Sequence, residues 1–206
     1  MAFQSVWYFS DLPTEVVEII ESDLSANFDD AMGDSRLMGD ALNKDKRNSQ
    51  NAWVPSHHWV GGFLWHYIMR ANRENFLYDL RCIDGESIQY TRYREGQFYG
   101  WHNDAGLAGQ YKPVTVGNRI EGLGQDFLNE NVEMVRKLSF VVQLSDPDDY
   151  EGGNLQLLDE MGKTYIAPRK RGTVILFDSR TQHRVQRVKS GVRKSLVGWT
   201  VGPRWK

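Results

Sequence analysis

Apolar and polar positions recur with two different periods along this chain, and the change of period divides it into two regions. Up to about residue 77, two stretches of apolar residues follow the spacing of an α-helix. A first helix is predicted to begin near Thr14, with Asp11 as a candidate N-cap, because apolar side chains follow at helical spacing: Val16, Val17, Ile19 and Ile20. Residues from about 28 to 54 are polar and rich in Asp and Asn, which indicates a loop with edge strands.

A second helix is predicted after Ser56, which is a candidate N-cap. Two neighbouring rows of apolar residues recur every four positions and form one broad stripe: Trp59, Phe63, Tyr67 and Ala71, and beside them Val60, Leu64 and Ile68. A helix with such a stripe packs on another apolar surface. We therefore expect residues 1–77 to form a helical region that supports the rest of the chain.

From about residue 78 the period falls to two, which is typical of β-strands. In residues 138–144, for example, the odd and even positions make two different faces: Leu138, Phe140, Val142 and Leu144 on one, Ser139, Val141 and Gln143 on the other. Strands are predicted over 87–94, 99–104, 138–144, 154–158, 163–166, 173–177, 183–188 and 193–201. Many short strands predict a mainly β barrel or jelly roll, buttressed by the N-terminal helices.

Residues 105–135 fit neither period and contain five glycines. A long irregular segment in a compact domain is usually functional or disordered. Because this one directly follows a candidate metal-binding motif, we expect a lid or substrate-binding loop.

Composition narrows the class of protein. A chain of 206 residues suits a single domain, 1–206. The net charge of −2 makes a nucleic-acid partner unexpected, because such proteins usually carry a basic excess. One cysteine allows neither an intrachain disulfide nor a cysteine zinc cluster. Neither a signal peptide nor an 18-residue apolar run is visible, so we expect no membrane partner and a cytoplasmic location.

The candidate chemistry begins with His102-Asn103-Asp104 and His183. Side chains alternate along a strand, so His102 and Asp104 project to the same side, and His183 begins another predicted strand. Two histidines and one carboxylate are the ligands of a non-haem Fe(II) site that leaves coordination positions open. A lone histidine more often makes a structural hydrogen bond, and the same three ligands can also bind Zn(II), so a zinc hydrolase stays an alternative.

The last predicted strand adds a candidate anion site. Arg193, Ser195, Val197 and Trp199 share one of its faces. A guanidinium and a hydroxyl two residues apart can bind one carboxylate, and a buried arginine is costly without an anion. Two interpretations stay open on these residues alone. The anion is either the carboxylate of a 2-oxo acid bound beside the metal or an acidic side chain of the protein itself.

Several stretches together resemble a known family. They are Tyr93-x-x-Gly96-x-x-Tyr99-x-x-His102-x-Asp104; Arg136-Lys137-Leu138-Ser139, Leu144-Ser145-Asp146 and Tyr150-Glu151-Gly152-Gly153-Asn154-Leu155; and His183-x-Val185 with Gly191-x-Arg193-x-Ser195. Over about residues 78–202 this pattern resembles the prolyl 4-hydroxylase-like branch of the 2-oxoglutarate/Fe(II)-dependent dioxygenases. Its cadence is similar to that of bacterial and phage-encoded PKHD-type hydroxylases.

The resemblance implies a double-stranded β-helix over 78–202, with iron held by the triad of His102, Asp104 and His183. It implies that 2-oxoglutarate chelates the iron and that its distal carboxylate binds Arg193. Further cosubstrate-binding positions are implied at Ser195, Tyr93, Gln143, Leu155 and Val185, although Gln143 stands where relatives place a tyrosine. Tyr99 and Trp199 are placed on the substrate side, and for Tyr99 a role as a core aromatic stays open.

The function that follows is hydroxylation of a C–H bond with Fe(II), 2-oxoglutarate and O2, releasing succinate and CO2. The resemblance also suggests L-ascorbate as a cofactor. The expected substrate is a prolyl residue in a peptide or protein, with a lysyl residue, a free amino acid or a small molecule as alternatives. Nucleic-acid demethylases of the superfamily usually carry a second arginine six residues after the first, where this chain has Trp199. A catalytically idle β-helix that serves as a binding or structural module is the alternative from another class.

Overall fold

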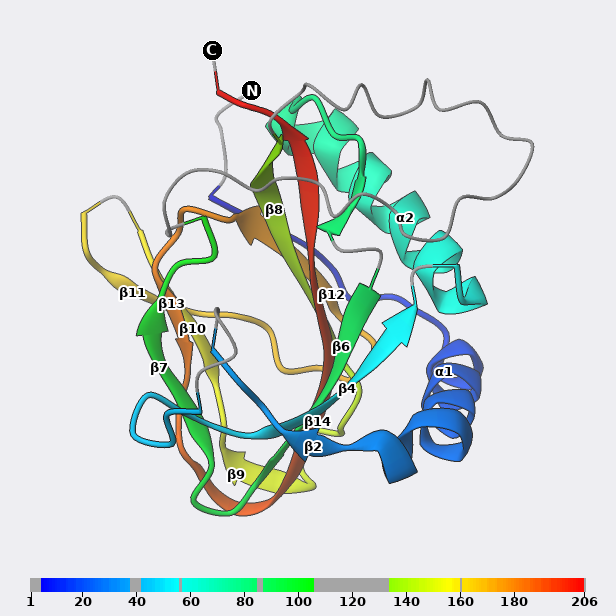
Figure 1. Ribbon diagram of the computed structural model, residues 1–206, viewed down its shortest axis with the longest axis vertical. Helices are drawn as coiled ribbons and strands as arrows, with labels where there is room; N and C mark the ends of the chain where they lie inside the picture. The colour runs from blue at the N-terminus through cyan, green and yellow to red at the C-terminus, as the bar shows by residue number, and fades with distance from the viewer. Residues whose placement is uncertain are drawn as a thin grey trace.

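The computed structural model describes residues 5–37, 42–55, 57–84, 87–105, 134–159 and 161–205. Two antiparallel sheets pack against each other, and two helices cover the outer face of the larger sheet (Figure 1). The prediction of a mainly β barrel or jelly roll buttressed by N-terminal helices is therefore confirmed. No helix in the described parts of the chain is long and apolar enough to cross a bilayer.

The larger sheet takes strands from nearly the whole chain. Its order is β1 (Val6–Phe9), β12 (Val174–Asp178), β8 (Met134–Gln143), β14 (Val188–Pro203), β6 (Ser87–Arg94), β4 (Gln50–Pro55) and β2 (Gly33–Asp34), and two short strands, β5 (Cys82–Ile83) and β9 (Tyr150–Gly152), also pair with β14. The smaller sheet has the order β11 (Thr164–Ile166), β10 (Leu155–Leu158), β13 (His183–Val185), β7 (Phe98–His102) and β3 (Arg47–Asn48).

The helices are α1 (Thr14–Phe28) and α2 (Trp59–Ala71), which are followed by a short 3₁₀ turn (Asp29–Ala31) and a π-helical turn (Asn72–Phe76) respectively. Each helix buries one stripe against the sheet: Val17, Ile20 and Leu24 from α1, and Val60, Leu64, Ile68 and Ala71 from α2. Of the two apolar rows predicted on α2, the row of Val60, Leu64 and Ile68 is fully buried, and from the other row only Ala71 is. Trp59 of the other row is 45% exposed and lies at the margin.

The alternation predicted for residues 138–144 places side chains in two apolar clusters, one between the larger sheet and the helices and one between the two sheets. Leu138, Phe140 and Val142 of β8 face the helices, and Val141 faces the smaller sheet together with residues of β10 and β12. Phe140 is fully buried and pairs with Gly198 of β14, where an added Cβ would collide with the Phe140 ring. The other face of β8 also carries Ser139 and Gln143 into the space between the sheets.

Some sequence expectations need correction. Asp11 does not cap α1: Pro13 occupies the N-cap position without a side-chain hydrogen bond, and Asp11 instead lies 3.7 Å from the Lys170 ammonium. The first 77 residues also supply strands β1 to β4. Of these, β2, β3 and most of β4 lie in the region of about 28–54 where edge strands were expected, whereas β1 was not predicted. Ser56 and residues 106–133, most of the expected lid, lie outside the described residues, while Met134 and Val135 belong to β8.

Candidate metal centre and its cavity

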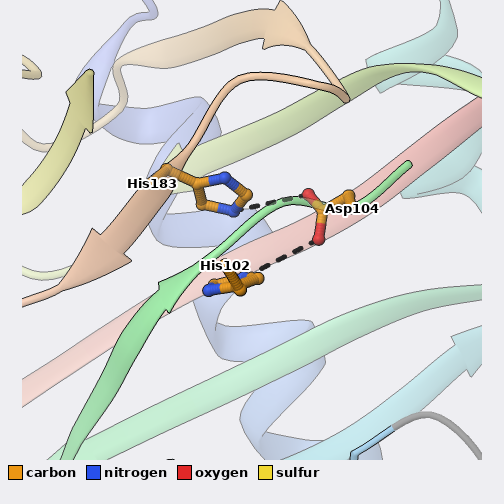
Figure 2. Close-up of side chains that lie close together, drawn as sticks. All are labelled: His102, Asp104 and His183. Carbon is orange, nitrogen blue, oxygen red and sulfur yellow. Dashed lines mark ion pairs between the residues drawn. The ribbon is translucent and has the colours of Figure 1, made fainter. Parts of the chain in front are cut away.

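Three ligand side chains converge where β7 and β13 pair. His102 ends β7, Asp104 follows two residues later, and His183 begins β13 directly opposite His102 (Figure 2). The Asp104 carboxylate lies 3.7 Å from His102 Nε2 and 3.4 Å from His183 Nε2. One ligand atom from each residue lies within 4.8 Å of the other two, and no second cluster of this kind occurs among the described residues. The arrangement can hold one metal ion.

Backbone carbonyls fix the orientation of both imidazole rings. Nδ1 of His102 lies 2.8 Å from the Gly100 carbonyl, and Nδ1 of His183 lies 3.0 Å from the Thr181 carbonyl. A carbonyl can only accept, so each Nδ1 carries the proton and each Nε2 presents a lone pair to the Asp104 side. His102 also stacks on Tyr99 with 3.6 Å between ring centroids, and Phe177 meets His183 edge-on.

Ser139 of β8 holds the Asp104 carboxylate from behind, and Ser179, which follows β12, holds the Asp104 backbone. Ser139 Oγ on β8 donates to Asp104 Oδ2 at 2.5 Å and lies 3.1 Å from Ser179 Oγ. The Ser179 carbonyl accepts hydrogen bonds from the backbone amides of Asp104 and Ala105. These contacts connect the end of β7 to the larger sheet and leave the other carboxylate oxygen to the metal position.

The electrostatics favour the ligand forms of these groups. Burial, reinforced by the charge that His183 can carry, lowers the pKa of His102 to about 4, so its ring is neutral near pH 7. Burial alone would raise the pKa of Asp104. The two histidines and the Ser139 hydrogen bond outweigh that effect and hold the Asp104 pKa below its ordinary value. A neutral imidazole beside an ionised carboxylate is what a divalent metal requires.

A cavity of about 710 Å³ opens onto this triad. Tyr93, Leu155, Val185, Arg193, Tyr99 and Trp199 all line it, as do the three metal-ligand candidates. The structure thus brings together most of the site residues that the sequence suggested. The indole Nε1 of Trp199 is buried there without a partner among the described residues, so a donor is available to a bound molecule.

Arg193 is the largest fully buried side chain of the described structure, with 1% exposure. It donates to Gln143 Oε1 at 2.9 Å and to Ser195 Oγ at 3.3 Å, and its guanidinium carbon lies 5.6 Å from the centre of the Tyr93 ring. Its Nε finds no partner in the described part of the chain. No described carboxylate pairs with it. The described residues therefore give no support to the alternative of an ion pair with an acidic side chain of the protein. A buried guanidinium without such a partner favours the binding of an anion.

Gln143 and Ser195 sit behind Arg193 and do not line the cavity. Gln143 is itself oriented by donating to the Pro168 carbonyl at 3.1 Å. Sequence reasoning missed Ser139 and Ser179, although Ser139 stood out as a polar residue on the same strand face as Gln143. It also missed Arg47, since residues 28–54 offered no motif.

Comparison with known proteins decides the family. A family model of the 2OG-Fe(II) oxygenase superfamily matches residues 88–201. The chain belongs to this superfamily. Its members use Fe(II), 2-oxoglutarate and O2, and the His102, Asp104 and His183 donors together with an uncompensated buried arginine in the same cavity fit the metal and its dicarboxylate.

Individual relatives agree with this assignment. A PKHD-type hydroxylase of Crocosphaera subtropica is 30% identical over 64% of this chain and 51% of its own length. The chain thus spans about half the length of that curated relative. A Pseudomonas putida prolyl-4-hydroxylase superposes with a TM-score of 0.68 at 16% identity, covering 98% of this chain and 94% of that one. A Trichoplax adhaerens prolyl hydroxylase superposes with a TM-score of 0.69 at 16% identity, covering 95% of this chain and 83% of that one. These two likenesses confirm the double-stranded β-helix fold.

Proposed function

We propose that this chain is an Fe(II)- and 2-oxoglutarate-dependent dioxygenase that hydroxylates a prolyl residue of a peptide or protein. The observation that carries the dioxygenase assignment is the uncompensated Arg193 guanidinium in the same cavity as the His102, Asp104 and His183 triad. The prolyl substrate is supported by the names of the relatives: PKHD-type hydroxylases by sequence and prolyl hydroxylases by fold.

In this proposal each part of the site has one task. His102 and His183 would hold the metal through Nε2, and Asp104 through the carboxylate that Ser139 orients. Arg193 would bind the distal carboxylate of 2-oxoglutarate, while Gln143 and Ser195 hold the guanidinium in place. The bound iron, with 2-oxoglutarate and O2, supplies the oxidation of a C–H bond to an alcohol, with succinate and CO2 as the other products. Leu155, Val185 and Val197 give the cavity apolar walls that exclude water.

The first experiment is an anaerobic titration with Fe(II) and then 2-oxoglutarate, followed by absorbance. A weak visible charge-transfer band is expected when a 2-oxo acid chelates iron on these ligands. The band should be absent in His183→Ala. Metal binding without the band would favour a zinc hydrolase, and absence of metal binding would favour a catalytically idle module.

Arg193→Met tests the anion site separately from the metal. Loss of a charged hydrogen-bond partner should weaken 2-oxoglutarate binding by about 10- to 100-fold while Fe(II) affinity stays near that of the wild type. Arg92→Met is the matched control, because Arg92 is a half-buried arginine that also binds a glutamine, Gln50, away from the cavity. Unchanged 2-oxoglutarate affinity in Arg193→Met would place the cosubstrate elsewhere. Mass spectrometry of proline-containing peptides, scored for one added oxygen, tests the substrate.

A further inference from the structure

A second buried arginine lines the same cavity. Arg47 lies on β3, is 6% exposed, and has only neutral hydrogen-bond partners. Its Nη2 donates to Gln89 Oε1 at 3.0 Å, its Nε donates to Ser49 Oγ at 3.1 Å, and its Nη1 reaches the Arg36 carbonyl at 3.5 Å. No carboxylate among the described residues pairs with it. Like Arg193, it is a buried cation for which the described residues supply no counter-charge.

The position of Arg47 separates it from the proposed cosubstrate site. Its guanidinium carbon lies 4.8 Å from the centre of the Tyr99 ring, and that ring stacks on the metal-ligand candidate His102. Arg193 lies instead against Tyr93 and β8. A dicarboxylate held by the metal at one end and by Arg193 at the other leaves no charge for Arg47.

The charge of the cavity points in the same direction. Asp104 is the single carboxylate among its described lining residues, whereas five cations line it: Arg36, Lys46, Arg47, Arg136 and Arg193. Asp84 neutralises Arg136 at 2.5 Å, and Arg193 is assigned to the cosubstrate. The metal, the Asp104 carboxylate, the cosubstrate and Arg193 sum to no net charge. Among the described lining residues Arg47 and Lys46 then leave a positive charge on this side of the cavity, which favours an anion.

We infer that Arg47 binds a carboxylate of the prime substrate and selects acidic substrates. The inference rests on the proposed function, because it takes the first carboxylate site as filled by 2-oxoglutarate. A guanidinium that is buried beside an aromatic ring and held by Gln89 and Ser49 is oriented in advance for a planar carboxylate. The carboxylate can come from the free end of a small amino-acid substrate or from an acidic side chain next to the reacting residue of a peptide.

Two matched pairs of probes distinguish these sources. N-acetyl-L-proline and its amide differ in a terminal carboxylate, and N-acetyl-Pro-Glu-amide and N-acetyl-Pro-Gln-amide differ in a side-chain carboxylate. Each probe is titrated calorimetrically, without oxygen, into protein loaded with Fe(II) and 2-oxoglutarate. The acidic member of one pair should bind at least about tenfold more tightly than its neutral partner, because it pairs with a buried charge. The pair that shows the preference identifies the source.

Variants connect the preference to the residue. Arg47→Met should abolish the tighter binding of the acidic probe, and Arg47→Lys should keep part of it. Arg92→Met should leave the preference unchanged. Arg47→Gln replaces the Met variant if that variant does not fold. Equal binding of both members in both pairs, absence of binding by all four probes, or a preference that survives Arg47→Met would overturn the inference.

The 2-oxoglutarate band, recorded without probe, separates this inference from the proposed function. Arg47→Met should retain the band with unchanged 2-oxoglutarate affinity. If it loses the band, Arg47 belongs to the cosubstrate site and the inference is wrong. If the wild type itself shows no band, the proposed function is wrong, and the probe titrations are repeated on the metal-free chain. There, an acidic preference that depends on Arg47 would support the carboxylate site by itself, and its absence would overturn that site too.

Discussion

The two faces of the larger sheet are built from the same strands but serve different ends. Toward the helices, β8 and β14 present Phe140, Val142 and Leu196, all fully buried and apolar. Toward the smaller sheet the same strands present Ser139, Gln143, Arg193 and Ser195, which are also buried but polar. The same degree of burial is therefore favourable for the apolar residues and costly for the polar ones unless they find partners.

On the helix face, burial removes apolar surface from water and stabilises the fold. On the inner face, burial makes each polar group depend on a specific partner, and Arg193 has no opposite charge among the described residues. The chemistry belongs to the polar residues of the inner face, while apolar residues stabilise the fold on both faces. Variants of the inner polar residues should consequently lose activity without losing the fold.

The largest effect is expected from Asp104→Ala. Removal of the one candidate carboxylate ligand should abolish detectable 2-oxoglutarate turnover and weaken Fe(II) binding strongly. The metal-free variant should unfold at nearly the same temperature as the wild type, because the apolar core on the helix face is unchanged. The control is Asp79→Ala, since Asp79 is an exposed aspartate that forms an ion pair with Arg81. Turnover at the wild-type rate in Asp104→Ala would remove this residue from the metal site.

Next in size is a pair of phenylalanines with the same burial on opposite faces. Phe140→Ala and Phe177→Ala should each cost about 3–5 kcal/mol of unfolding free energy, because each leaves a core cavity. Phe177 packs edge-on against His183, so its loss should also weaken Fe(II) binding, whereas loss of Phe140 should not. Urea unfolding and Fe(II) titration measure both quantities. Equal Fe(II) affinities in the two variants would contradict the division between faces.

A smaller effect is expected from Ser139→Ala, which removes the hydrogen bond that orients the Asp104 carboxylate. Fe(II) affinity should fall about 10- to 100-fold, as is typical when a group supporting a metal ligand is lost. The control is Ser145→Ala, since Ser145 is also buried and hydrogen bonded but contacts Val192 and Lys194 away from the cavity. An identical Fe(II) affinity in both variants would show that Ser139 does not support the ligand.

The smallest effect concerns pH. The His102 pKa is about 4 in the folded protein and about 6.5 when unperturbed, so between these values the unfolded chain binds a proton that the folded chain does not. The metal-free protein should lose stability as pH falls through this window. The lowered Asp104 pKa acts in the same direction, but only below the ordinary value of 3.8. Urea unfolding from pH 7.5 to 4.5 should show a shallower decline in His102→Gln; an equal decline would assign it to other groups.

Local pattern was sufficient for the strands that carry the site. The period of two over residues 138–144 gave the correct faces for Phe140 and Ser139, and the predicted strand at 183–188 begins with His183, as observed. It failed for β1, a four-residue strand that takes its place by pairing with the distant β12. It also gave no bounds for the edge strands expected over about 28–54, the region of β2, β3 and most of β4. It also failed for the α1 cap, where Pro13 replaces the expected Asp11.

What the sequence determined by itself is the set of candidate ligands and the family, because both depend on residue types at fixed spacings: His102, Asp104, His183 and Arg193. Only the tertiary structure decided which charges remain without a counter-charge. Whether Arg193 or Arg47 has an acidic neighbour depends on strands far apart in the chain, and the cost of leaving a guanidinium unpaired depends on its burial. Spacing along the chain carries neither quantity.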